Sequence, residues 1–139
     1  TNGQLHYSEG SFIGYRAWRK SRRIPLIPFG HGLSYTAFKS EVIAFSKTSA
    51  RVRISNVGKR AGAHVIQIYG ENSTLGSFER RLVGFSKVFL DPSQSKEIEV
   101  AFEPLAFKAY DNGWRDILGT WNIVLADNAF EDGESFSIE

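Results

Sequence analysis

The carboxylate and imidazole groups in the first third of the chain are the first candidates for chemistry. Glu9 could act as a general acid, but no second carboxylate lies near it in the sequence. Since acid–base catalysis by carboxylates needs paired groups in different environments, we expect Glu9 to anchor the backbone or to pair with a base such as Arg16. His6, His31 and His64 are far apart, and neither a cysteine nor an H-x-x-x-H pair supports them. The pattern therefore predicts no metal site.

The tryptophans Trp18, Trp114 and Trp121 could stack against sugar rings. Trp121 alternates with Ile123 and Leu125 at a period of two, which predicts a place in a strand core. Trp114 follows an Asp-Asn-Gly turn and is the best candidate for an exposed sugar platform. The alternative is that its large ring covers the end of a sandwich.

The remaining motifs do not point to a cofactor or a nucleic acid. Residues 16–23 hold a basic cluster, but residues 40–139 carry eleven bases against fourteen acids, so we interpret the cluster as a solvated loop. Asn72, Ser73 and Thr74 fit an N-glycosylation acceptor, which matters only in a secreted eukaryotic protein. Neither a phosphate-binding glycine loop nor a serine triad motif is present, and we expect no cofactor.

Short alternating segments separated by turn residues run from residue 41 to the end of the chain. Residues 50–55 place Val52 and Ile54 on one face and arginines on the other, as in a half-buried strand. The other predicted strands cover residues 41–46, 64–69, 82–90, 97–102, 107–110, 120–126 and 134–138, with a polar loop at 72–76. This spacing predicts an all-β, antiparallel two-sheet sandwich of the immunoglobulin or fibronectin type III kind. No sustained helical period is present.

Residues 1–39, called the strap below, do not follow that rhythm. They carry six bases and one acid, and their aromatic residues are irregularly spaced. His31 lies between two glycines and is expected in a tight turn. Because an ordinary surface does not carry such an aromatic patch, we predict that the strap packs on a neighbouring domain. The expected docking residues are Phe12, Tyr15, Arg16, Trp18, Phe29, His31 and Tyr35.

Composition is that of a folded protein, with 42% apolar and 23% charged residues, which disfavours disorder. The length suits one domain with a substantial extension. No apolar run approaches the roughly 20 residues of a membrane span, so membrane insertion is not expected. The chain has neither cysteine nor methionine; the missing methionine suggests a processed or excised piece. A secreted or periplasmic location is favoured.

Several motifs carry a family resemblance over nearly the whole chain. The most specific are YSEGSFIGYR at residues 7–16 and PLIPFGHGLSYTAF at residues 25–38. Weaker matches are VGKRAGAHVIQIY at 57–69, RLVGFSKVFL at 81–90, GW at 113–114 and GTWNIVL at 119–125. Together they resemble the end of the glycoside hydrolases of family 3, the β-glucosidase and β-xylosidase group.

This resemblance implies a domain order. Residues 1–39 would be the linker from the end of an α/β sandwich domain, and residues 40–139 would be the family's C-terminal fibronectin type III-like sandwich. The family's aspartate nucleophile and its usual glutamate acid/base lie in two earlier domains. The resemblance therefore assigns no catalytic residue to this sequence.

The preferred hypothesis is a non-catalytic structural domain whose partners are the catalytic domains of the same β-glucosidase-like enzyme. The alternative is an accessory module that binds carbohydrate or a cell surface, with Trp114 as its platform. A free-standing adhesion sandwich is a third interpretation, and the apolar strap speaks against it.

Overall fold

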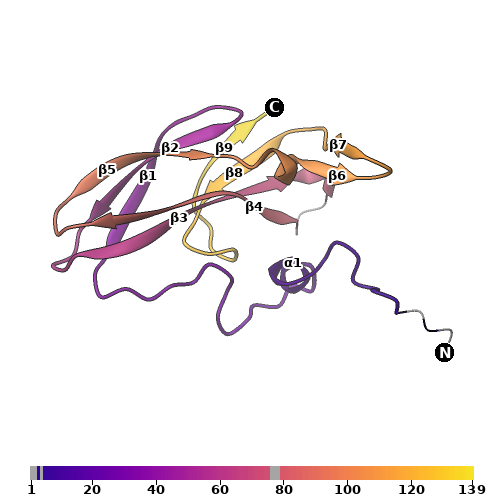
Figure 1. Ribbon diagram of the computed structural model, residues 1–139, viewed down its shortest axis with the longest axis horizontal. Coiled ribbons are helices and arrows are strands. Elements are labelled where there is room, and N and C mark those ends of the chain that lie inside the picture. The colour runs from indigo at the N-terminus through magenta and orange to yellow at the C-terminus, as the bar shows by residue number, and fades with distance from the viewer. Residues whose placement is uncertain (1–2, 4, 76–78) are drawn as a thin grey trace.

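The computed structural model describes residues 3, 5–75 and 79–139 as two packed antiparallel sheets with a small hairpin at one end (Figure 1). The fold predicted from the sequence is confirmed. One sheet has three strands in the order β1 (Phe38–Phe45), β2 (Ser49–Asn56) and β5 (Ser95–Ala101). The other has four in the order β4 (Arg80–Leu90), β3 (Gly62–Asn72), β8 (Trp121–Leu125) and β9 (Glu134–Ile138). The hairpin pairs β6 (Lys108–Tyr110) with β7 (Trp114–Asp116).

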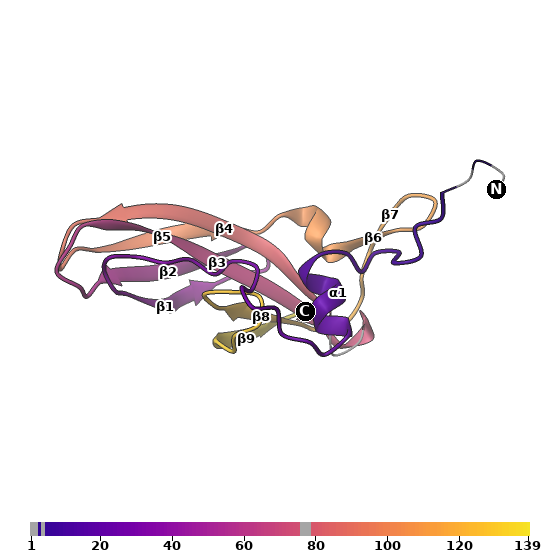
Figure 2. The ribbon, with the colours of Figure 1, turned by 90° about the horizontal axis from the view of Figure 1, so that it is seen from below.

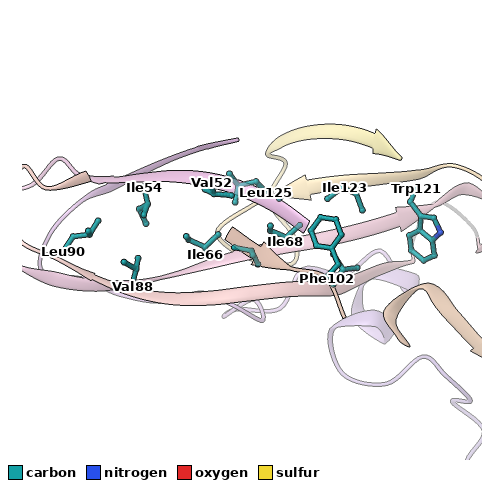
Figure 3. Packing of buried hydrophobic residues seen from close by; sticks show 13 residues of the cluster. Val52, Ile54, Ile66, Ile68, Val88, Leu90, Phe102, Trp121, Ile123 and Leu125 are labelled. Carbon is teal, nitrogen blue, oxygen red and sulfur yellow. The ribbon is translucent and has the colours of Figure 1, made fainter. Parts of the chain in front are cut away.

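Alternation along the strands builds the core between the sheets. Val52 and Ile54 of β2 face Ile66 and Ile68 of β3, and all four side chains are at most 1% exposed. Figure 3 shows these residues as a single layer between the two sheets. Each fully buried aliphatic side chain stabilises the fold by roughly 1.5–3 kcal/mol, so this layer holds the chain together without disulfides.

Trp121 closes one end of this core, as its alternation with Ile123 predicted. Its side chain is 4% exposed and packs edge-on against Phe107, with ring centroids 5.0 Å apart. Its Nε1 donates to the carbonyl oxygen of Ile117 at 3.4 Å. Gly70 makes room for the indole, because a Cβ at that position would lie 3.1 Å from Cε3 of Trp121.

Three short helices and one strand were not predicted from the sequence. They are α1 (Tyr15–Lys20), the 3-10 helices η1 (Ser73–Leu75) and η2 (Pro104–Phe107), and strand β7. The predicted loop at 72–76 is instead the end of β3 followed by η1, and its last residue lies outside the described residues. In the described part of the chain, no helix is both long and apolar enough to cross a membrane.

Helix α1 corrects the expectation that the strap is wholly irregular. It begins after Gly14, whose φ is 56°, and ends at Ser21. Its arginines, alanine and lysine favour helix, but six residues are too few for an isolated helix to be stable in water. Its contacts with the four-stranded sheet must therefore hold it in place.

Candidate docking surface

From α1 onward, the strap lies along the outer face of the four-stranded sheet before the chain enters β1 (Figure 2). Backbone hydrogen bonds attach it at two points beyond α1. Ala129 N donates to the carbonyl oxygen of Phe29 at 2.9 Å, and Val57 N donates to that of Ala37 at 2.9 Å. Near the second point, the Thr36 hydroxyl donates to Oδ1 of Asn56 at 2.7 Å. The strap is thus fixed to its own sandwich.

Tyr15 is the aromatic anchor of α1. Its ring stacks on Phe29 with centroids 4.7 Å apart and meets Tyr69 edge-on at 6.4 Å. Its hydroxyl oxygen accepts a 2.9 Å hydrogen bond from Leu82 N. Burial raises the pKa of Tyr15 above its usual value, so the phenol stays neutral. Tyr15 is half-buried against its own sheet, and its contact with a neighbouring domain stays a prediction.

Arg16 also makes its ion pair within the chain and not with Glu9. Its guanidinium pairs with Glu79, and Arg81 Nε donates to the same carboxylate oxygen at 2.9 Å. Glu79 is only 3% exposed. Removal of a buried carboxylate between two cations strongly destabilises the fold, because the positive charges of its two partners would be left uncompensated. Glu9 itself is exposed, and its carbonyl oxygen accepts a hydrogen bond from Phe12 N.

A second arginine pair shares Glu71. Arg19 and Arg80 donate to its Oε1 at 3.2 and 2.7 Å, and both also donate to the carbonyl oxygen of Ala129. Burial, and secondarily the charge of Arg80, lower the pKa of Arg19, although arginine remains protonated in proteins. The basic cluster at residues 16–23 is therefore not simply a solvated loop, since two of its members join α1 to the sheet.

Gly30 permits the closest approach of the strap to the sheet. Its carbonyl oxygen accepts from Nε2 of Gln67 at 3.0 Å, and Tyr69 Oη donates to Oε1 of Gln67 at 2.7 Å. The φ angle of Gly30 is +91°, a conformation that other residues rarely adopt. A Cβ there would overlap the Gln67 side chain and lie 2.9 Å from Tyr69 Oη.

Gly30→Ala is therefore expected to lower the free energy of unfolding by about 2 kcal/mol, through backbone strain and displacement of Gln67. Urea denaturation of residues 1–139 would measure this. Gly32→Ala is the matched control, because a Cβ at Gly32 meets nothing within 4 Å and its φ is not positive. Equal losses for both variants would contradict the close approach.

The strap also exposes several large apolar side chains to solvent. Leu26, Leu33 and Tyr35 are 99%, 94% and 92% exposed. Ile24 and Ile27 are also largely exposed. Beside the strap, strands β3 and β4 expose Val65, Phe85 and Phe89. We call this surface, formed by the eight residues, the docking face.

The opposite outer face of the sandwich has a different character. On the three-stranded sheet, Arg53 pairs with Glu41 at 2.9 Å and with Glu97 at 2.8 Å. The hydroxyls of Ser55 and Ser95 hydrogen-bond to each other at 2.7 Å. This face is suited to water, whereas the docking face consists of exposed apolar side chains, the kind of surface that marks an interaction site.

The remaining predicted docking residues occupy different environments. Phe12 is partly buried beneath the Lys20 ammonium, whose nitrogen lies 3.9 Å from the ring centroid. Trp18 is 45% and Phe29 47% exposed. His31 is exposed, and its N–H donates to the carbonyl oxygen of Pro28 in the expected turn. Their contact with another domain stays a prediction.

The sequence did not predict two features of this surface: the exposed leucines of the strap and the carboxylates that pair with the arginines of α1. Leu26 and Leu33 lie in a segment without periodicity, so no pattern showed which side they face. The acidic partners Glu71 and Glu79 are separated from α1 by more than 50 residues. The one local signal was Glu79 directly before two arginines.

A cleft of about 550 Å³ separates part of the strap from β3. His31, His64 and Asp127 line it, and His64 Nε2 lies 3.6 Å from Asp127 Oδ1. Burial lowers the pKa of His64, partly offset by Asp127, so the imidazole is neutral at pH 7. Among the described residues, no three His, Cys, Asp or Glu side chains converge as a metal site would require.

The structure also shows the positions of Trp114 and of the glycosylation motif at Asn72. Trp114 lies on the β6–β7 hairpin and is 56% exposed, so it does not cover the sandwich core. Asn72 is 1% exposed, and its Oδ1 accepts hydrogen bonds from the backbone and hydroxyl of Thr74. The glycosylation motif is therefore not accessible in the folded chain, and that interpretation is corrected.

Comparison with known proteins agrees with this architecture. The profile of the fibronectin type III-like domain family matches residues 64–128. Probable β-glucosidase K of Emericella nidulans is 39% identical over 91% of the chain, and thermostable β-glucosidase B of Acetivibrio thermocellus is 37% identical over 81%. The chain covers only 16% of each of these relatives.

Solved structures give the same result for the strap and sandwich together. The crystal structure of DesR, a β-glucosidase from Streptomyces venezuelae in complex with D-glucose, aligns over 99% of the chain with a TM-score of 0.86 and 31% identity. The β-glucosidase of Kluyveromyces marxianus aligns over 100% with a TM-score of 0.89 and 27% identity. The chain covers 19% and 18% of these structures.

The two sheets and the profile match define a fibronectin type III-like domain. More particularly, the chain belongs to glycoside hydrolase family 3, and it corresponds to the C-terminal region of its β-glucosidase relatives, which carries this domain.

Proposed function

We propose that the chain is the non-catalytic C-terminal domain of a longer family 3 glycoside hydrolase that cleaves terminal β-glycosidic bonds. In this proposal the docking face packs on the catalytic domains and holds the sandwich at a fixed angle to them. The domain division at residues 39 and 40 belongs to the same proposal. The observation that carries it is the set of exposed leucines and aromatics on a strap that is itself hydrogen-bonded to the sandwich.

The fixed backbone matters because it reduces the entropy lost on docking. A flexible apolar ribbon would have to be ordered when it bound, whereas this strap is already ordered by its hydrogen bonds and arginine pairs. A leucine that becomes fully buried contributes roughly 1.5–3 kcal/mol. Leu26 and Leu33 are almost fully exposed in the free chain, so the burial of each on docking would contribute an amount of this order.

The test is a chimera in which this chain replaces the matching region of β-glucosidase B from Acetivibrio thermocellus. We expect the chimera to hydrolyse an aryl β-glucoside. The double change Leu26→Ser and Leu33→Ser should lower its melting temperature by several degrees while leaving that of residues 1–139 alone nearly unchanged, because both leucines are exposed in the free chain.

Leu118→Ser is the matched control, since Leu118 is 80% exposed but lies outside the docking face. It should leave the melting temperature of the chimera unchanged. If the double variant and the control melt alike, the docking face does not contact the catalytic domains.

A further inference from the structure

The hairpin formed by β6 and β7 projects from one end of the sandwich (Figures 1 and 2). Tyr110 pairs directly with Trp114 across the turn, and Lys108 pairs with Asp116. The turn is closed by a 2.9 Å bond from Asp111 N to the carbonyl oxygen of Gly113. Because opposed and alternate residues of a hairpin share a face, all four paired side chains lie on the same side.

That face combines aromatic surface with polar groups. The rings of Tyr110 and Trp114 have centroids 5.6 Å apart at an interplanar angle of 74°. Tyr110 is 70% exposed, so both rings are open to solvent. Next to them, Lys108 Nζ lies 2.6 Å from Oδ1 of Asp116. Two exposed aromatic rings, steeply inclined to each other, thus adjoin a donor and an acceptor within one strand pair.

Neither ring is needed to close the core. The base of the hairpin is held by Ile117 N, which donates to the carbonyl oxygen of Phe107 at 2.9 Å, and by Arg81, which donates to that of Lys108 at 2.9 Å. The core at this end is covered by Phe107 and Trp121. The exposed aromatic pair therefore stabilises only its own hairpin through this cross-strand contact and does not close the core.

The charges of the hairpin select the kind of ligand. Two bases and two acids pair off: Lys108 with Asp116, and Arg115 with Asp111 at 3.9 Å. A nucleic acid or another polyanion requires an excess of positive charge, which this face lacks. A purely apolar protein surface would desolvate the Lys108–Asp116 pair without replacing its bonds to water. A neutral ligand with both an apolar face and hydroxyl groups satisfies all four side chains.

We propose that this face of the β6–β7 hairpin binds a neutral pyranose polymer. The C–H face of one sugar ring stacks on the indole of Trp114, and the edge of Tyr110 borders the ring. Hydroxyl groups of the sugar bond to the Asp116 carboxylate and the Lys108 ammonium. This proposal rests on the hairpin alone and does not depend on the docking face.

The test is affinity electrophoresis of residues 1–139 in gels containing hydroxyethyl cellulose, barley β-glucan or xylan. We expect at least one of these glycans to retard the chain. Trp114→Ala should weaken binding about tenfold, since loss of an aromatic contact and its buried area accounts for roughly that factor. Phe89→Ala is the matched control, an exposed aromatic outside the hairpin that should leave retardation unchanged.

Three outcomes would overturn the proposal. The first is no retardation by any of the glycans, and the second is equal retardation of the chain and of Trp114→Ala. The third is a lower melting temperature of the β-glucosidase chimera on Trp114→Ala, which would mean that the hairpin is covered by a catalytic domain. The melting temperature of residues 1–139 separates a binding effect from unfolding, because Trp114→Ala, which removes only a contact within the hairpin, should change it little.

Discussion

Trp121→Ala is expected to lower the free energy of unfolding by about 4 kcal/mol, within the range measured for removal of large buried aromatic side chains. The indole fills the end of the core between Phe107 and Gly70, and the vacated space cannot collapse because both sheets are fixed by their strand pairing. Figure 3 shows Trp121 at the end of the buried layer. Urea denaturation followed by circular dichroism would measure the loss.

Trp114→Ala is the matched control, because it removes the same side chain from an exposed position. Its effect on the free energy of unfolding should be only about 1 kcal/mol, from the loss of the contact with Tyr110. If the alanine variant of Trp121 does not fold, Trp121→Phe gives a smaller loss of the same origin. Similar losses from Trp114→Ala and Trp121→Ala would show that the core does not end at Trp121.

Glu79→Gln is expected to lower the free energy of unfolding by about 3 kcal/mol, because it leaves Arg16 and Arg81 partly buried without a counter-charge. The loss should be accompanied by faster amide exchange in α1, since Arg16 joins the helix to the sheet through this carboxylate. Hydrogen exchange of residues 15–20, together with urea denaturation, would measure both effects.

The control is Glu41→Gln, which removes the carboxylate of an exposed ion pair with Arg53. Exposed pairs contribute less than about 1 kcal/mol, and Glu41 does not contact α1. If the two variants were equally stable, the arginine pairs would not hold the strap, and its leucines would not be preorganised for docking.

The strap thus has two sides with different chemistry. Toward the sheet it uses an aromatic stack, two shared carboxylates and the close approach at Gly30. Away from the sheet it exposes leucines and Tyr35. A segment held in this way can present apolar side chains in a fixed arrangement, which a flexible linker of the same composition could not do.

Local alternation determined most of the sandwich in advance. In β2, Val52 and Ile54 alternate with arginines because one face of the strand meets the core and the other meets water. This period of two can be recognised from neighbouring residues alone. Trp121 could be assigned to the core for the same reason. Strand β7 was missed because three exposed residues carry no alternation of burial.

The environment of the strap was decided only by the tertiary structure. Arg16 and Glu79 are separated by 63 residues, and no local pattern shows that a cation and a carboxylate so far apart will share a half-buried site. Helix α1 is too short to form from propensity alone, and its contacts with β3 and β4 stabilise it. The sequence alone therefore determined the sheets, because the alternation that predicts a strand is local. Which side of the strap faces inward was decided only by the tertiary structure, because it depends on contacts between distant segments.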